Sequence, residues 1–78
     1  MKTISIFQVQ DINILLKNNN FDYVSKLHDT CGNQSLSLEC IGESIDINIL
    51  CSLINDYLKS HYLKVIPGTI NPYNLILE

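Results

Sequence analysis

The fold of this chain is decided by residues 23–40, which read YVSKLHDTCGNQSLSLEC. Apolar and polar side chains alternate toward both ends of this stretch, and a period of two residues predicts strands with one buried face. We expect one strand over 23–28 and another over 35–41, joined by a tight connection. The stretch therefore predicts a β-hairpin.

A two-residue turn at Cys31 and Gly32 determines which residues of the hairpin face each other. The predicted cross-strand pairs are Thr30 with Asn33, His28 with Ser35, Leu27 with Leu36, Lys26 with Ser37 and Val24 with Glu39. Side chains alternate between the two faces of a strand. The face toward the core then carries Tyr23, Leu27, Leu36 and Leu38, and the other face carries Lys26, His28, Ser35, Ser37 and Glu39.

Helical periodicity is clearest after the break at 42–44. The apolar positions at i, i+3, i+4, i+7 and i+11 are Ile47, Leu50, Cys51, Ile54 and Leu58. This spacing predicts an amphipathic helix. Before the hairpin, alternation over 3–9 predicts a strand, and Asp11 can cap a short helix that ends near Asn20. After the second helix, 62–66 and 74–77 are expected as strands.

The expected element order is therefore β-α-β-β-α-β-β, in a single α+β domain over residues 1–78. Two helices with one apolar stripe each must cover one face of an antiparallel or mixed sheet, which gives a two-layer sandwich. Right-handed crossovers favour the ferredoxin-like arrangement, with the first and third strands central and the last hairpin at an edge.

Composition excludes several classes of function. The chain has 78 residues, five Lys, no Arg and a net charge of -3, which is unlike a nucleic-acid-binding protein. Its start lacks a signal-peptide pattern, and no apolar run is long enough to span a membrane. The three cysteines are widely spaced and form no Cys-x-x-Cys pair, which is typical of reduced thiols in the cytoplasm.

The turn of the hairpin holds most of the reactive side chains. A thiol near an imidazole can be held as thiolate, so Cys31 with His28 could bind a ligand or act as a nucleophile, although Asp29 opposes the negative charge. In the alternative reading, Gly32 provides the positive φ of a turn and Cys31 is incidental. We take His28, Asp29, Cys31 and Gly32 as candidate binding residues.

We assign no catalytic residue, metal site or cofactor. His28 and Cys31 would be only two ligands, and the common phosphate, zinc-protease and serine-hydrolase motifs are missing from the sequence. Cys40 and Cys51 are expected in the core, and His61 is expected to cap the end of the second helix.

The segment Leu27-His28-Asp29-Thr30-Cys31-Gly32 resembles the Leu-(Arg or His)-Asp-(Ala or Thr)-Cys-Gly signature of a small bacterial family, the RDAC family, whose members are about this length. His28 stands where the family would have Arg, so any role of a guanidinium would be lost. The family has no assigned activity. The resemblance directs attention to Asp29, Cys31 and Gly32 and implies no substrate.

Our leading hypothesis is a non-catalytic binding or regulatory module that self-associates as a homodimer and binds an unknown small ligand or protein. A two-layer domain leaves one sheet face uncovered. The C-terminal strand, with Leu75, Ile76 and Leu77, is apolar on both sides, and we expect it to be an open edge that pairs with another copy. The alternative is a thiol- or metal-dependent protein that uses Cys31 and His28.

Overall fold

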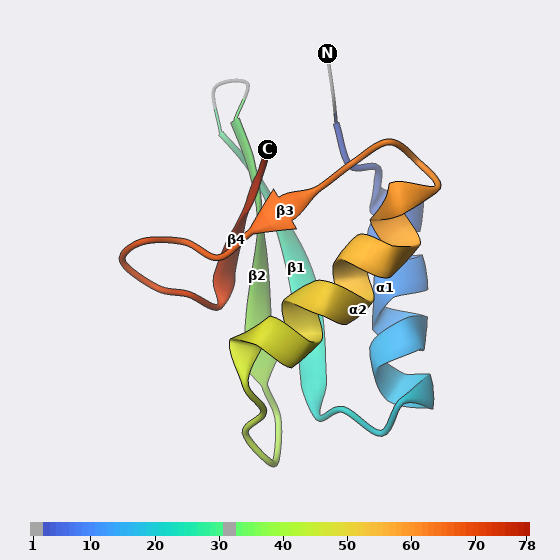
Figure 1. Cartoon of the computed structure of the whole chain (residues 1–78), viewed down its shortest axis with the longest axis vertical. Coiled ribbons are helices and arrows are strands. Elements are labelled where there is room, and N and C mark those ends of the chain that lie inside the picture. The colour runs from blue at the N-terminus through green and yellow to red at the C-terminus, as the bar shows by residue number, and fades with distance from the viewer. Residues whose placement is uncertain (1–2, 31–32) are drawn as a thin grey trace.

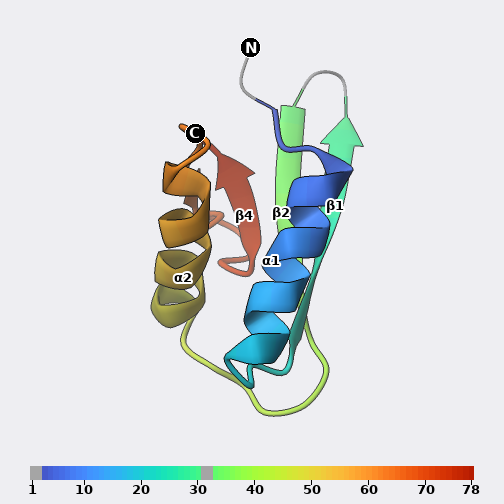
Figure 2. The ribbon, with the colours of Figure 1, turned by 90° about the vertical axis from the view of Figure 1, so that its right-hand side faces the viewer.

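The computed structural model describes residues 3–30 and 33–78 (Figure 1). The elements are α1 (Ile6–Asn18), β1 (Tyr23–Thr30), β2 (Asn33–Cys40), α2 (Ile47–Lys59), β3 (Val65–Ile66) and β4 (Asn74–Leu77). The four strands form one antiparallel sheet in the order β1-β2-β4-β3. Both helices lie on the same side of this sheet (Figures 1 and 2). The α+β class and the two helices on one face are confirmed.

The strand predicted over 3–9 is wrong, because α1 begins at Ile6. Ser5 is the N-cap: its side chain accepts from the backbone N–H of Gln8 at 3.2 Å, and the Gln8 side chain accepts from the N–H of Ser5 at 2.8 Å. This reciprocal capping box stabilises a helix start. The alternation was misleading because Ile4 is buried while Ile6 is 57% exposed.

The ferredoxin-like order is also wrong. It requires a strand before the first helix, and the residues described ahead of α1 form none. The last hairpin, β3 with β4, does lie at an edge as expected, but β3 is its outer strand and β4 lies between β2 and β3. The C-terminal strand is therefore not an open edge, and the expected pairing of two such strands has no free ladder to use. The strand expected over 62–66 is reduced to the two residues of β3.

The hairpin is confirmed in every predicted pair, from Val24 opposite Glu39 to Thr30 opposite Asn33. Tyr23, Leu36 and Leu38 are buried as expected. The proposed turn at Cys31 and Gly32 lies outside the described residues. One prediction about the hairpin fails: Cys40 is exposed, because it ends β2 where the chain leaves the sheet, and its thiol contacts the carbonyl of Gly42 at 3.3 Å.

The second helix also agrees with its predicted stripe. Asp46 caps α2 by accepting from the N–H of Asn48 at 2.8 Å. The buried residues of the helix are Leu50, Cys51, Ile54 and Leu58. They pack with Val9, Ile12 and Leu16 of α1 in one core cluster. Burial of these side chains is the main stabilising term of so small a domain.

An asparagine on each helix bonds the backbone of an edge strand. Asn13 of α1 accepts from the N–H of Ser25 at 2.7 Å and donates to its carbonyl at 3.2 Å. Asn55 of α2 does the same for Val65 at 2.9 and 3.0 Å. Each side-chain amide replaces part of a missing neighbouring strand, so both edges of the sheet are partly closed.

Candidate functional site

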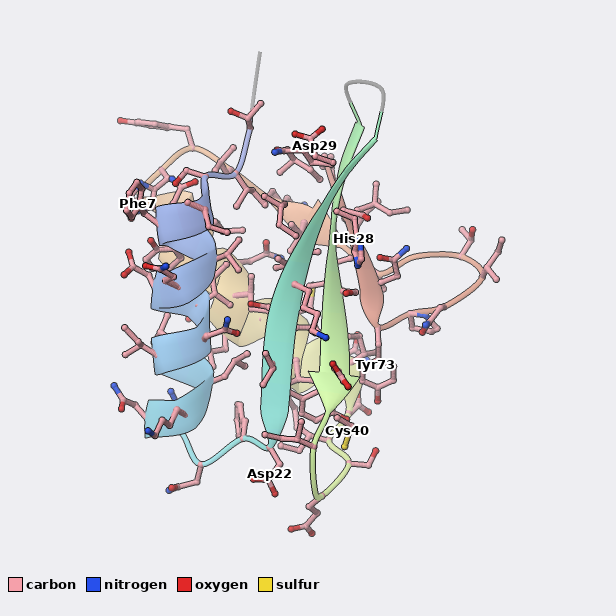
Figure 3. The ribbon with its side chains drawn as sticks, turned by 180° about the vertical axis from the view of Figure 1, so that it is seen from behind. Phe7, Asp22, His28, Asp29, Cys40 and Tyr73 are labelled. Atoms are coloured by element: carbon pink, nitrogen blue, oxygen red, sulfur yellow. The ribbon has the colours of Figure 1, made fainter. Side chains whose placement is uncertain are left out.

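A pocket of about 540 Å³ lies on the sheet surface that faces away from the helices. We call this surface the open face, and its strand residues are Val24, Lys26, His28, Ser35, Ser37, Glu39, Ile66, Asn74 and Ile76. The pocket is closed on one side by the connection between β3 and β4, residues 67–73, which we call the 67–73 loop. Figure 3 looks onto this face, with the loop extending to one side of the sheet.

The strand register places the polar side chains of the pocket. His28 of β1 lies opposite Ser35 of β2, and Ser35 lies opposite Ile76 of β4. Asn74 is opposite Ser37 in the same ladder. Since these positions alternate with the core-facing leucines, they all point to the side without helices. The sheet thus supplies an imidazole, two hydroxyls, an amide and one apolar side chain.

His28 and Ser37 are joined at 2.9 Å between Nε2 and Oγ. Ser37 Oγ also lies 3.5 Å from the carbonyl of Lys26, which can only accept a hydrogen bond. We therefore assign the Ser37 proton to that carbonyl and the shared proton to His28 Nε2. In this arrangement the imidazole does not act as a base on Ser37. A serine nucleophile needs the opposite polarity and a group that orients the imidazole.

The 67–73 loop has a shape fixed by its own backbone. A Cβ at Gly68 would lie 2.6 Å from the carbonyl oxygen of Asn74 and 2.7 Å from that of Asn71, so no larger residue fits. The side-chain oxygen of Asn71 accepts from the N–H of Tyr73 at 3.0 Å, and the backbone carbonyl of Asn71 accepts from the N–H of Asn74 at 3.0 Å. These bonds hold Ile70 outward, with 99% of its surface exposed.

Two stacked tyrosines anchor the far end of this loop. The rings of Tyr23 and Tyr73 are 5.8 Å apart and 8° from parallel. The Tyr73 hydroxyl donates to the carbonyl of Ile45 at 2.7 Å, and the Tyr23 hydroxyl accepts from the N–H of Ile45 at 3.1 Å. Desolvation, followed by the contact with Tyr23, raises the pKa of Tyr73 above its ordinary value. The loop is thereby tied to β1 and to the segment that precedes α2.

Of the two predicted site residues that the structure describes, His28 and Asp29, His28 alone lies in the pocket. His28 lines it, together with the serines that the register predicted on the same face. Asp29 points to the opposite face, where its carboxylate lies 3.5 Å from the Gln34 side-chain nitrogen (Figure 3). Cys31 and Gly32 lie outside the described residues. Their predicted meeting with His28 stays a prediction.

The sequence did not predict that the 67–73 loop forms one wall of the pocket. Gly68, Thr69, Ile70 and Asn71 line the pocket although they lie about thirty residues after the end of the hairpin. The only local signal was the pair of turn markers, Pro67-Gly68 and Asn71-Pro72, which isolates an apolar Ile70 between two turns. That pattern predicts a projecting loop but not the sheet face over which it lies.

Within residues 3–30 and 33–78, no cluster of three or more His, Cys, Asp or Glu side chains could hold a metal ion. Over the same residues, no helix has the length and apolar character needed to cross a bilayer. Burial raises the pKa of the Cys51 thiol, and the Asn55 amide and the charge of Lys64 act in the other direction without reversing the shift. Cys51 is therefore a poor nucleophile.

No family model matches the sequence, and no curated protein or solved structure matches it significantly. The resemblance of the hairpin turn to the RDAC family accordingly stays a prediction.

Proposed function

We propose that the protein is a non-catalytic binding module that self-associates and that recognises a peptide segment on its open face. The observation that carries the proposal is the pocket between the hairpin and the 67–73 loop. Its walls come from parts of the chain that are far apart in sequence, and Gly68 allows the loop to close on itself. A pocket with few convergent polar groups and an apolar wall is typical of a binding site.

The chemistry of the lining favours an uncharged ligand with both donors and acceptors. Ser35, Asn74 and Thr69 offer hydroxyl and amide groups, and the described residues that line the pocket include no carboxylate or ammonium group. Peptide groups satisfy such side chains without the cost of transferring a charge from water. Ile76, which is 41% exposed, provides an apolar surface beside them. A peptide with one aliphatic side chain meets both requirements.

We also infer a cytoplasmic location. The thiol of Cys40 is exposed and free, which suits a reducing compartment.

The test is a titration of ¹⁵N-labelled protein with N-acetyl-isoleucine amide, followed by NMR. We expect the amide signals of Ser35, Asn74 and Ile76 to shift, with a Kd in the range of about 1 mM that suits so small a ligand. N-acetyl-aspartate amide is the matched control and should shift them far less. Shifts confined to other surfaces, or equal shifts with both probes, would reject this site.

A further inference from the structure

We propose that the peptide segment bound in the pocket is residues 68–71 of a second copy of this chain, so that two copies exchange Ile70 across a two-fold axis. This inference rests on the proposed function and names the partner of the same site. Ile70 of each copy would lie in the pocket of the other, against Ile76, and its neighbouring peptide groups would bond Ser35 and Asn74.

The projecting side chain and the pocket lie side by side on one face. Ile70 is 99% exposed and belongs to the loop that forms one wall of the pocket, lined also by His28 and Ser35. A two-fold interface is built from one patch that is complementary to itself. A protrusion next to a hollow of about 540 Å³ is such a patch, because one rotation places both protrusions at both hollows.

The charges of the open face allow two copies to approach. The chain has a net charge of -3, which opposes association through most of its surface. On the open face, Lys26 pairs with Glu39 at 2.9 Å, and beside β3 and β4 Lys64 lies 4.0 Å from Glu78. These charges cancel, and the 67–73 loop carries none. The acidic excess therefore does not oppose contact through this face.

The sheet edges are less suited to association. Backbone groups of Ser25 at one edge and Val65 at the other are bonded by Asn13 and Asn55. A strand from another copy would have to displace these amides. Contact through the open face requires no such displacement.

Sedimentation equilibrium of the whole chain tests the inference. We expect a reversible dimer of twice 8.9 kDa, and Ile70→Asp should weaken it by more than about tenfold. Ile14→Asp is the matched control, since Ile14 is 57% exposed on α1, away from the open face, and should leave the dimer intact. A dimer lost in Ile14→Asp but kept in Ile70→Asp overturns the inference.

A mixing experiment tests the exchange itself. Ser35→Tyr should fill the pocket but keep the projecting Ile70, whereas Ile70→Asp removes the projecting side chain, changes one residue of the pocket wall and leaves the strand side of the pocket unfilled. Each variant alone should be monomeric, and an equal mixture should contain heterodimers, because one of the two contacts is restored. If the mixture stays as monomeric as its parts although the natural chain dimerises, reciprocal exchange is wrong.

Failure of the inference can be separated from failure of the proposed function. If the natural chain is monomeric, the exchange is wrong, and NMR titration with the peptide acetyl-Gly-Thr-Ile-Asn-amide then decides the rest. Shifts at Ser35 and Asn74 would keep peptide recognition by the pocket while rejecting a second copy as its partner. The absence of shifts at about ten times a millimolar Kd would reject both.

Discussion

At both edges of the sheet an asparagine of a helix bonds the backbone of the edge strand, but the two asparagines differ in what else they bond. At β1, Asn13 bonds the N–H and carbonyl of Ser25 and also accepts from its hydroxyl at 2.7 Å. At β3, Asn55 bonds the N–H and carbonyl of Val65, beside the thiol of Cys51. Besides backbone, Asn13 therefore accepts from a buried hydroxyl, whereas Asn55 donates to a buried thiol, that of Cys51, at 3.5 Å.

The strands that receive these amides also differ in their other support. β1 pairs with β2 over eight residue pairs, whereas β3 pairs with β4 over two. A long ladder holds β1 in place even without α1. The two-residue β3 depends on Asn55 much more, so the same substitution should raise the free energy of the folded state at one edge and detach a strand at the other.

The largest effect is expected for Asn13→Ala. It leaves the N–H, carbonyl and hydroxyl of Ser25 without their partner, and Ser25 is only 3% exposed. Unsatisfied buried groups cost about 1–3 kcal/mol each, and entry of water at an edge reduces the sum, so we expect a loss of about 3 kcal/mol in urea unfolding. A loss below about 0.5 kcal/mol would show that water replaces the amide fully.

Asn13→Asp is the matched control for this edge. The carboxylate keeps the acceptor for the N–H of Ser25 but sets an oxygen against its carbonyl, so it should not restore stability. Ser25→Ala should cost less than Asn13→Ala, because it removes one hydroxyl and leaves the amide bonded to the backbone.

For Asn55→Ala we expect a smaller global loss of about 1–2 kcal/mol and a local change at β3. Cys51 reports on that change, because its thiol lies against Val65 and is buried. In a background with Cys31→Ser and Cys40→Ser, labelling of Cys51 should be slow in the parent protein and much faster with Asn55→Ala. Asn13→Ala should accelerate it only as far as global unfolding requires.

The smallest effect concerns the link between the two clamping helices. Tyr57 of α2 donates to the carboxylate of Asp11 of α1 at 2.7 Å. Desolvation, the hydrogen bond and the negative charge of Asp11 raise the pKa of Tyr57 to about 12. An unperturbed tyrosine, as in the unfolded chain, has a pKa of about 10, so the folded state holds the proton of Tyr57 more tightly.

The stabilisation from this proton is complete below about pH 10 and decreases as the pH rises toward the folded pKa of about 12. In Tyr57→Phe the free energy of unfolding should therefore decrease less over that pH interval than in the parent protein. At neutral pH the substitution should cost less than about 1 kcal/mol, since exposed pairs contribute little. Urea unfolding at neutral and alkaline pH measures both. Because the pKa of Tyr73 is also raised, some alkaline decline should remain. An unchanged profile would contradict the assignment to Tyr57.

Local patterns predicted those parts of the fold that depend on neighbours in the sequence. The register of the hairpin followed from a two-residue turn, and the stripe of α2 followed from its spacing. The start of α1 was missed although Ser5 and Gln8 form a recognisable capping box, because alternation around Ile4 was given more weight. Cys40 was wrongly predicted to be buried, because the alternation of β2 continues to its last residue whereas the helices do not cover that end of the strand.

The candidate site also has one half that local sequence patterns predict and one half that they do not. Its hairpin half, His28 with Ser35 and Ser37, follows from the register alone. Its loop half depends on β4 entering the sheet beside β2, and no local pattern states which strand a distant segment will join. The bidentate bonds of Asn13 and Asn55 were missed for the same reason, since each joins a helix to a strand through tertiary packing.

The pairing of β4 with β2 also sets the order in which the site can form. The hairpin needs only local loop closure, whereas Leu36 meets Leu75 across the whole of α2. Closing the longer loop costs more chain entropy, so the hairpin can form first and β4 is expected to dock later. Until then His28, Ser35 and Ser37 lie on an incomplete surface. The pocket can therefore bind a ligand only after the docking of β4 beside β2, the same step that completes the sheet.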